Sequence, residues 1–271
     1  MDDRSVKYHG HKIFYRVFGK GAPVILIHGF GEDGSIWDRQ VNDLQTNFQF
    51  IIPDLPGTGK SYGALEAESE WSMEKFADII RLIAIEEKLE KFTLLGHSMG
   101  GYISLAFASL WPGILQGLGL IHSTAFADTP EKIETRQKGI AFIKKMGADL
   151  FLRQLIPNLY GDAFKCIHPE EINRQVEAAM GFTNESLISY YEAMIRRPDR
   201  IEVLLTFQKP VLFIIGAEDK AVNLADSLAQ CHLPEESHVH FLEKSGHMGM
   251  CEEALKTTSA IKEFLWRLNE N

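Results

Sequence analysis

The chain has 271 residues and a formal net charge of −9 at pH 7, with 45% hydrophobic and 24% charged residues. This length suits one α/β domain, and the composition is typical of a globular protein. The negative charge, with no long basic run, argues against nucleic acid or an anionic membrane as the main partner. No apolar run reaches the ~18 residues of a membrane span. We expect a small-molecule partner and leave the oligomeric state open.

The N-terminal residues and the cysteines indicate the cellular compartment. The acidic start, Met1-Asp2-Asp3-Arg4, lacks an apolar signal region. Cys166, Cys231 and Cys251 are odd in number and widely spaced, without a Cys-x-x-Cys pair. This usage suits a reducing compartment and argues against a disulfide framework. We expect a cytoplasmic protein.

The first half of the chain alternates strand and helix patterns. Alternating apolar residues predict an antiparallel β-hairpin from residues 6–8 and 12–17. Further predicted strands cover residues 23–27, 48–52, 92–95 and 113–121, and predicted helices cover 35–44, 72–89 and 103–110. Ser72 is the expected cap of the second helix. Strands that alternate with helices predict an α/β fold, in which helices cover both faces of a mostly parallel sheet.

The alternation lapses after His122. Residues 130–197 have a helical pattern with Gly and Pro breaks and no strand-like run. The sheet resumes over residues 210–216 and 237–242, and a C-terminal helix closes the chain. We therefore predict a core domain of residues 1–122 and 205–271, with a helical cap inserted at residues 123–204.

The stretch Gly96-His97-Ser98-Met99-Gly100 has the form of a nucleophile elbow, because a short apolar run enters it and a small-residue helix leaves it. A serine on so sharp a turn has a strained backbone, and glycine two residues to either side avoids collisions. The N–H groups and positive dipole at the helix start favour the anion that forms in acyl transfer. The sequence thus predicts Ser98 as a nucleophile and the Met99 N–H as an oxyanion donor.

A serine nucleophile needs a histidine base that is oriented by a carboxylate. Catalytic groups in an open parallel sheet gather beyond the carboxyl ends of the strands. His247 follows the last predicted strand, so we predict that it is the base. Glu218 and Asp219 both follow the strand before it. We favour Asp219 as the acid, although Glu218 competes with it and either residue could instead cap a helix near Ala221.

Other histidines near these positions fit the base role less well. We assign His28 and His97 to packing and hydrogen bonding. The stretch His122-Ser123-Thr124 after the predicted strand 113–121 offers no acid before Asp128. His238 and His240 share one strand face, but two ligands without a third do not predict a metal site.

The order Ser98, Asp219, His247, together with the Gly-His-Ser-Met-Gly turn, resembles the α/β-hydrolase superfamily over nearly the whole chain. His28-Gly29-Phe30 looks like the oxyanion loop of that family, which implies the Phe30 N–H as second donor beside that of Met99. The turn from Asp54 to Ser61 is similar to the Asp-x-x-Gly-x-Gly-x-Ser turn of the family, and the helical insertion is similar to its cap. The resemblance implies hydrolysis, most often of carboxylic esters, without a cofactor.

The expected substrate pocket is apolar and suits an acyl chain or an aromatic group. We predict that Phe30, Trp37, Met99 and Met248 line it with a minority of the aromatic and methionine residues of the cap. Arg153, Arg196 and Arg197 could bind a substrate carboxylate, although a solvated cap surface suits them better.

The sequence therefore predicts a serine hydrolase that cleaves a small carboxylic ester through an acyl-enzyme on Ser98. One alternative keeps the same triad and changes the reaction to C–C bond hydrolysis, thioester hydrolysis or a lyase reaction. Another is a ligand-binding receptor with vestigial activity. A fold does not decide among these alternatives.

Overall fold

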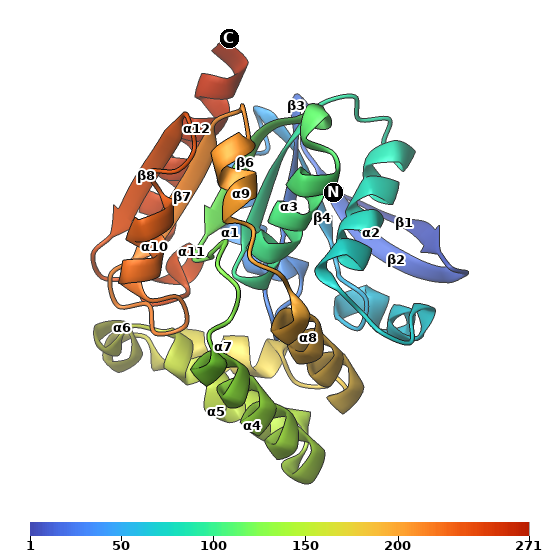
Figure 1. Cartoon of the computed structure of the whole chain (residues 1–271), viewed down its shortest axis with the longest axis vertical. Coiled ribbons are helices and arrows are strands. Elements are labelled where there is room, and N and C mark those ends of the chain that lie inside the picture. The colour runs from blue at the N-terminus through green and yellow to red at the C-terminus, as the bar shows by residue number, and fades with distance from the viewer. Residues whose placement is uncertain (271) are drawn as a thin grey trace.

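The computed structural model describes residues 1–270 and is built on a sheet in the order β1-β2-β4-β3-β5-β6-β7-β8 (Figure 1). The strands are β1 (Asp2–Tyr8), β2 (His11–Phe18), β3 (Ala22–Ile27), β4 (Phe48–Pro53), β5 (Phe92–His97), β6 (Leu115–Ile121), β7 (Val211–Gly216) and β8 (Ser237–Leu242). The β1–β2 and β2–β4 pairs are antiparallel, and the others are parallel. The predicted mostly parallel sheet with an antiparallel edge hairpin is confirmed.

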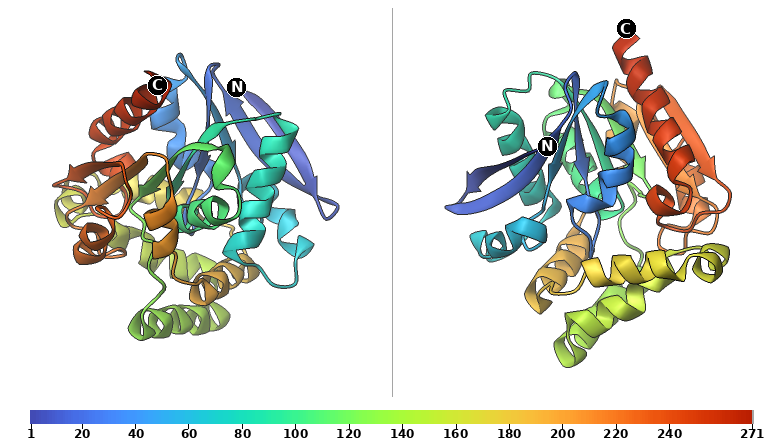
Figure 2. Two further views of the ribbon diagram at one scale, coloured as in Figure 1. Left: turned by 45° about the horizontal axis from the view of Figure 1, so that its top comes forward. Right: turned by 180° about the vertical axis from the view of Figure 1, so that it is seen from behind.

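Helices cover both faces of the sheet. Figures 1 and 2 place α2 (Met73–Glu86), α3 (Met99–Leu110) and α10 (Leu224–Gln230) on one face, and α1 (Asp38–Leu44) and α12 (Ala254–Glu270) on the other. All residues of β5 and β7 are buried. Continuous burial explains why these strands do not alternate between apolar and polar residues.

The parallel register brings several loops to one edge of the sheet. Ile27 of β3 pairs with Gly96 of β5, and His97 pairs with Ile121 of β6. Ile121 stands one residue before His122 and pairs with Ile214 of β7. The turns that follow β3, β5, β6 and β7 therefore meet beyond the carboxyl ends of the strands.

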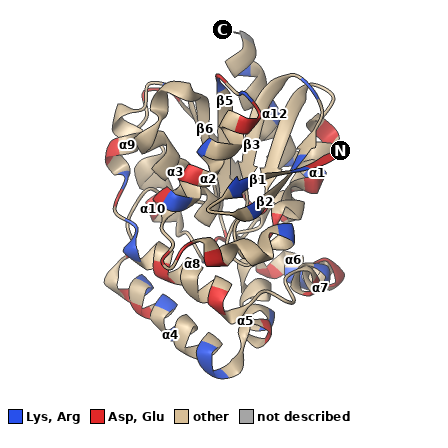
Figure 3. Cartoon of the chain, turned by 90° about the vertical axis from the view of Figure 1, so that its right-hand side faces the viewer, with Lys and Arg blue, Asp and Glu red and all other residues tan. Residues whose placement is uncertain are grey.

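The chain between β6 and β7 is helical, as predicted. It contains α4 (Pro130–Met146), α5 (Ala148–Leu155), α6 (Asp162–Ile167), α7 (Pro169–Ala178), α8 (Asn184–Arg196) and α9 (Ile201–Thr206). We call α4 to α8 the inserted helices, and Figures 1 and 2 show them beyond the carboxyl ends of the strands. In Figure 3, acidic and basic positions are mixed along them. No helix within residues 1–270 is long and apolar enough to cross a membrane.

Some element boundaries differ from the prediction. Residues Pro112–Ile114 form a short 3-10 helix, so β6 begins at Leu115 rather than at residue 113. The helix expected near Ala221 begins at Leu224, and Asn223 is its cap, because its Oδ1 accepts from the Asp226 N–H over 2.8 Å. Ser72 caps α2 as predicted, with its hydroxyl oxygen 3.3 Å from the Lys75 nitrogen.

Candidate active site

Ser98 stands on the turn between β5 and α3. Its backbone has φ 51° and ψ −115°, in the left-handed half of conformational space that non-glycine residues rarely adopt. The Ser98 N–H donates to the Ile121 carbonyl over 2.9 Å, and the Ser123 hydroxyl donates to the Ser98 carbonyl over 2.7 Å. A Cβ on Gly96 would collide with the backbone of Gly100. Both glycines of the elbow are therefore sterically required.

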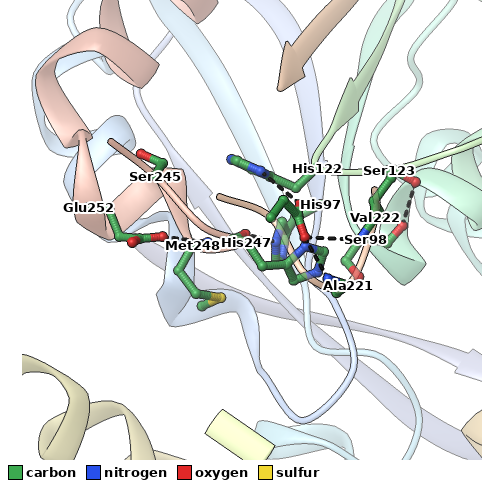
Figure 4. A network of polar contacts seen from close by, with 12 residues as sticks. His97, Ser98, His122, Ser123, Ala221, Val222, Ser245, His247, Met248 and Glu252 are labelled. Atoms are coloured by element: carbon green, nitrogen blue, oxygen red, sulfur yellow. Dashed lines mark hydrogen bonds and ion pairs between the residues drawn. The ribbon is translucent and has the colours of Figure 1, made fainter. Parts of the chain in front are cut away.

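His247 lies on the loop between β8 and α11 (Gly249–Glu252). Its Nδ1 is 2.8 Å from Oδ2 of Asp219, and its backbone N–H donates to the Leu159 carbonyl over 2.7 Å. A carboxylate only accepts hydrogen bonds, so Nδ1 carries the proton and Nε2 is left as an acceptor. Figure 4 shows His247 beside Ser98, His97 and His122.

The structure distinguishes Asp219 from Glu218, the two carboxylates that competed for the role of the acid. Asp219 Oδ1 accepts from the N–H groups of Ala221 and Val222 at 2.8 and 2.9 Å, and Oδ2 faces His247. Burial raises the pKa of Asp219, but the charge of His247 and the hydrogen bonds from His122 and His247 lower it further, so its pKa is well below the ordinary range. Glu218 points elsewhere, and its Oε2 accepts from the N–H of Asp162 over 3.1 Å.

His122 is a second partner of Asp219 that the sequence analysis missed. Its Nδ1 is 3.3 Å from the same Oδ2 atom, and it has a positive φ of 48° directly after β6. Burial lowers the pKa of His122 to about 4, so the ring is neutral near pH 7 and donates to Asp219 from Nδ1. This position at the end of β6 had been set aside only because it offers no acid.

A buried ion pair lies behind the elbow. His97 Nδ1 is 2.9 Å from Oε2 of Glu32, and His97 Nε2 is 3.0 Å from the carbonyl oxygen of His247. Burial opposes both charges, but each partner stabilises the other, so the pKa of His97 is raised and that of Glu32 is lowered. The assignment of His97 to hydrogen bonding is confirmed. Glu32 was not singled out, and no local sequence pattern marks it.

The loop after β3 carries the expected second oxyanion donor. Glu32 Oε2 also accepts from the N–H of Gly29 over 2.7 Å, and His28 Nε2 accepts from the N–H of Leu55 over 3.1 Å. The Phe30 N–H donates to no group within residues 1–270. The first N–H groups of a helix also lack an intrahelical acceptor, which applies to Met99 at the start of α3.

Ser98 and His247 both line a cavity of about 500 Å³ between the sheet edge and the inserted helices. The other lining residues are Phe30, Glu32, Tyr102, Thr129, Glu131, Lys132, Thr135, Arg136, Leu155, Asn158, Leu159, Tyr191, Met194, Lys220, Ala221, Val222 and Asn223. The Phe30 ring stacks on Tyr191, with centroids 4.3 Å apart and an 8° interplanar angle. The wall nearest the oxyanion loop is therefore aromatic.

Three predicted pocket residues are not in this lining. Trp37, Met99 and Met248 have side chains that pack in the core, and none is more than 1% exposed. The indole of Trp37 packs edge-on against His97, at 6.5 Å between centroids. The prediction that they line the pocket is wrong, because a large apolar side chain beside a site can face either the core or the ligand. Phe30 and, from the inserted helices, Leu155, Tyr191 and Met194 do line it.

His122, Asp219 and His247 are also the one group of potential metal donors found among the described residues, with ligand atoms within 4.8 Å of one another. Both imidazoles direct Nδ1 at the carboxylate. Each of these nitrogens therefore carries a proton and has no lone pair for an ion. The cluster fits a hydrogen-bonded network rather than a metal centre.

Comparison with known proteins identifies relatives of the whole chain. The putative carbamate hydrolase RutD of Agrobacterium fabrum is 29% identical over 220 residues, which are 78% of this chain and 83% of the relative. Lipase 1 of Psychrobacter immobilis is 25% identical over 267 residues, 94% of this chain and 81% of the lipase. A thermophilic esterase from Thermogutta terrifontis, solved with malate bound, superposes with a TM-score of 0.90 at 27% identity and covers 99% of both chains.

Residues 22–165, more than half of the chain, match the alpha/beta hydrolase fold family. The matched segment contains β3 to β6, the elbow turn and the loop after β3. The sheet order, the loops gathered at its carboxyl edge and the relatives agree with this match. The chain therefore belongs to the alpha/beta hydrolase fold family.

Proposed function

We propose that this protein is a serine hydrolase that cleaves a small carboxylic ester, with Ser98 as nucleophile, His247 as base and Asp219 as acid. One observation carries the proposal. The strained turn presents Ser98 to a cavity that His247 also lines, and His247 is held by Asp219 at 2.8 Å. A serine nucleophile requires a histidine base that a carboxylate orients, and these contacts support that assignment.

In the first half-reaction, Ser98 Oγ attacks the ester carbonyl carbon and gives its proton to Nε2 of His247. The carbonyl oxygen becomes an oxyanion, which the N–H groups of Phe30 and Met99 stabilise. The bond to the alcohol oxygen then breaks, and the alcohol leaves with the proton from His247. An acyl-enzyme on Ser98 remains.

In the second half-reaction, water attacks the acyl carbon and gives a proton to His247. The bond to Ser98 Oγ breaks, the serine regains a proton from His247, and the carboxylic acid is released. Asp219 stays ionised throughout, which agrees with its lowered pKa.

We further propose that residues 123–204 act as a cap domain over a core of residues 1–122 and 205–271. The inserted helices contribute Leu155, Tyr191 and Met194 to the cavity wall, whereas Ser98 and His247 come from the core. The cap would therefore select the substrate and leave the chemistry to the core.

The names of the relatives favour an ester over the other substrates of the same triad. They include an esterase, a lipase and a putative carbamate hydrolase, all of which denote hydrolysis at a carbonyl carbon that carries an oxygen or nitrogen leaving group. C–C bond hydrolysis, thioester hydrolysis, a lyase reaction and a receptor role remain the alternatives.

A serine-directed fluorophosphonate probe, run beside p-nitrophenyl esters of increasing acyl length, tests the proposal. We expect labelling and turnover by the native protein, and neither by Ser98→Ala. Labelling without turnover would point to another serine reaction. Neither labelling nor turnover would leave the receptor role.

A further inference from the structure

The cavity contains a buried cation that the proposed chemistry does not use. Arg136 lies in α4 and lines the cavity beside Tyr102 and Tyr191. Its Nε donates to Oδ2 of Asp128 over 2.6 Å, and its Nη2 is 3.3 Å from Oδ1. Only 12% of the Arg136 side chain is exposed. The remaining nitrogen, Nη1, has no hydrogen-bond partner among residues 1–270.

Asp128 cannot neutralise Arg136 alone, because it also serves a second guanidinium. Arg197 Nη1 is 2.9 Å from Asp128 Oδ1, and both of these side chains are almost fully buried. Arg197 also donates to the carbonyl groups of Met194 and Phe126, at 2.9 and 3.0 Å. Both terminal nitrogens of Arg197 therefore have partners, whereas Nη1 of Arg136, a cavity-lining residue, has none among the described residues.

The charges around this end of the cavity do not cancel. Arg136, Arg197 and Lys132 are positive, and Asp128 is negative. The exposed Glu131 at the cavity wall leaves a balance of one positive charge.

The other charged lining residues are paired elsewhere. Glu32 pairs with His97, and the exposed Lys220 shares Asp162 with Lys165, at 3.1 and 2.6 Å. The excess of positive charge at this end of the cavity fits an anionic group on the ligand.

The Tyr102 phenol responds to this excess charge. Burial raises the pKa of Tyr102, but the charges of Arg197, Lys132 and Arg136 outweigh burial, so its pKa is lower than usual. The Arg197 guanidinium lies 3.9 Å from the centre of the Tyr102 ring. Tyr102 stands four residues after Ser98, about one helical turn along α3. The positive end of the cavity is thus close to the nucleophile.

We propose that this end of the cavity binds a carboxylate on the substrate, with Arg136 as its main partner and Tyr102 and Lys132 beside it. The inference rests on the proposed function, since it names the substrate class of the same site. The substrate is then an ester that carries a second, free carboxylate a short distance from the bond that is cleaved. A guanidinium binds a carboxylate through parallel N–H donors, and such charge-assisted bonds are stronger than neutral ones.

The test compares matched pairs of esters that differ in charge but hardly in shape. One member is the monoethyl ester of a dicarboxylic acid with four to six carbons, and the other has its free carboxylate replaced by a primary amide. A second set carries the carboxylate or amide on the alcohol part. Acid release at constant pH gives kcat/KM. We expect the native protein to prefer the carboxylate about tenfold or more in one of the sets.

Variants locate the preference. Arg136→Gln should reduce the carboxylate-to-amide ratio to about one, and Arg136→Lys should restore part of it. Arg153→Gln is the matched control, because it removes one exposed positive charge from the inserted helices outside the cavity lining. It should leave the ratio unchanged. A ratio near one in the native protein, or one that survives in folded Arg136→Gln, would overturn the proposal while leaving the hydrolase function intact.

A binding experiment makes the two proposals separable. Calorimetric titration of Ser98→Ala with monoethyl glutarate and its amide measures affinity without turnover. We expect the carboxylate to bind about tenfold more tightly, and Arg136→Gln in the same background to abolish the difference. If the native protein cleaves no ester and takes no fluorophosphonate, the proposed function has failed. The anion site then stands if the carboxylate binds more tightly than the amide, and it falls if the two bind equally.

Discussion

His97 donates a hydrogen bond from Nε2 to the backbone carbonyl of His247 over 3.0 Å, while its Nδ1 faces Glu32 at 2.9 Å. A ring that donates from both nitrogens is an imidazolium. The residue directly before the candidate nucleophile therefore holds the loop of the candidate base. Glu32 connects the same unit to the loop after β3, because it also accepts from the Gly29 N–H.

Glu32→Gln should destabilise the protein most in mildly acidic solution. The lowered pKa of Glu32 contributes stability above its ordinary value of 4.5. The raised pKa of His97 contributes stability that is complete below 6.5 and is lost as pH rises through the folded value. Between pH 4.5 and 6.5 we expect Glu32→Gln to lower the free energy of unfolding by about 3 kcal/mol, because removing one partner of a buried ion pair leaves the other charge uncompensated.

Urea unfolding of native protein and Glu32→Gln at pH 5 to 9 measures this effect. The difference in the free energy of unfolding between the native protein and the variant should be largest near pH 5 to 6.5 and smaller at high pH. Glu131→Gln, an exposed change in the inserted helices, is a control. A difference that does not vary with pH would show that the pair is not ionised.

Ser98→Ala should remain folded and lose about 10⁴-fold or more in ester turnover. The substitution removes one oxygen and relieves no collision, so its thermal melt should match that of the native protein. Steady-state kinetics on the best p-nitrophenyl ester measures the loss. Ser123→Ala controls for a nearby hydroxyl that only supports the turn. Turnover by clean Ser98→Ala close to the native rate would remove the mechanism.

Asp219→Asn should cost roughly 10³- to 10⁴-fold in kcat, whereas Glu218→Gln should cost less than about tenfold. The amide can hold His247 in the wrong tautomer and cannot stabilise the imidazolium. Glu218 instead accepts from the Asp162 N–H, and no hydrogen bond joins its carboxylate to His247 among the described residues. Parallel kinetics on the two variants measure the contrast. If Glu218→Gln were the inactive one, the acid would have to be reassigned.

His122→Asn should reduce the sensitivity of the fold to acid. Burial lowers the pKa of His122 from 6.5 to about 4, so the unfolded chain binds a proton in this range that the folded protein does not. Stability therefore falls as pH drops from 6.5 towards 4, by about 3 kcal/mol in total. Asparagine tolerates the positive φ at this position.

Urea unfolding of native protein and His122→Asn at pH 7, 6, 5 and 4.5 tests this prediction. Between pH 7 and pH 4.5 the free energy of unfolding should fall by about 2 kcal/mol less in the variant than in the native protein. His168→Asn, an exposed change between α6 and α7, is the comparison. Equal losses in native protein and His122→Asn would mean that His122 is protonated in the folded state.

Local patterns were sufficient for most of the fold. Buried parallel strands are short apolar runs, and a Cβ on Gly96 would collide with Gly100 four residues later, so both features are visible in the sequence. Gly100 is required by a long-range contact, because its Cβ would collide with the carbonyl of Ile27. Helix starts were less certain. Asp219 Oδ1 accepts hydrogen bonds from two N–H groups of the turn after β7, and α10 begins only after this turn, at Leu224.

Long-range polar pairing was not visible in the sequence. Glu32 and His97 are 65 residues apart, and His122 reaches Asp219 across 97 residues. Periodicity reports which face of an element is apolar, not which charges meet. The sequence analysis favoured a solvated surface for Arg153, Arg196 and Arg197, which is wrong for Arg197, because its side chain is buried. Arg136, which the sequence analysis did not single out, is the arginine in the cavity wall.

The attachment of the His247 loop to the inserted helices limits how this protein can be re-engineered. The His247 N–H depends on the Leu159 carbonyl, and Glu252 accepts from the N–H of Gly161 over 2.7 Å. A transplanted insertion from a relative would have to bring a carbonyl to the same place, or the base would lose its anchor. We therefore expect an exchange of the inserted helices to succeed only with segments whose 3-10 turn matches Ile156–Leu159 in backbone path.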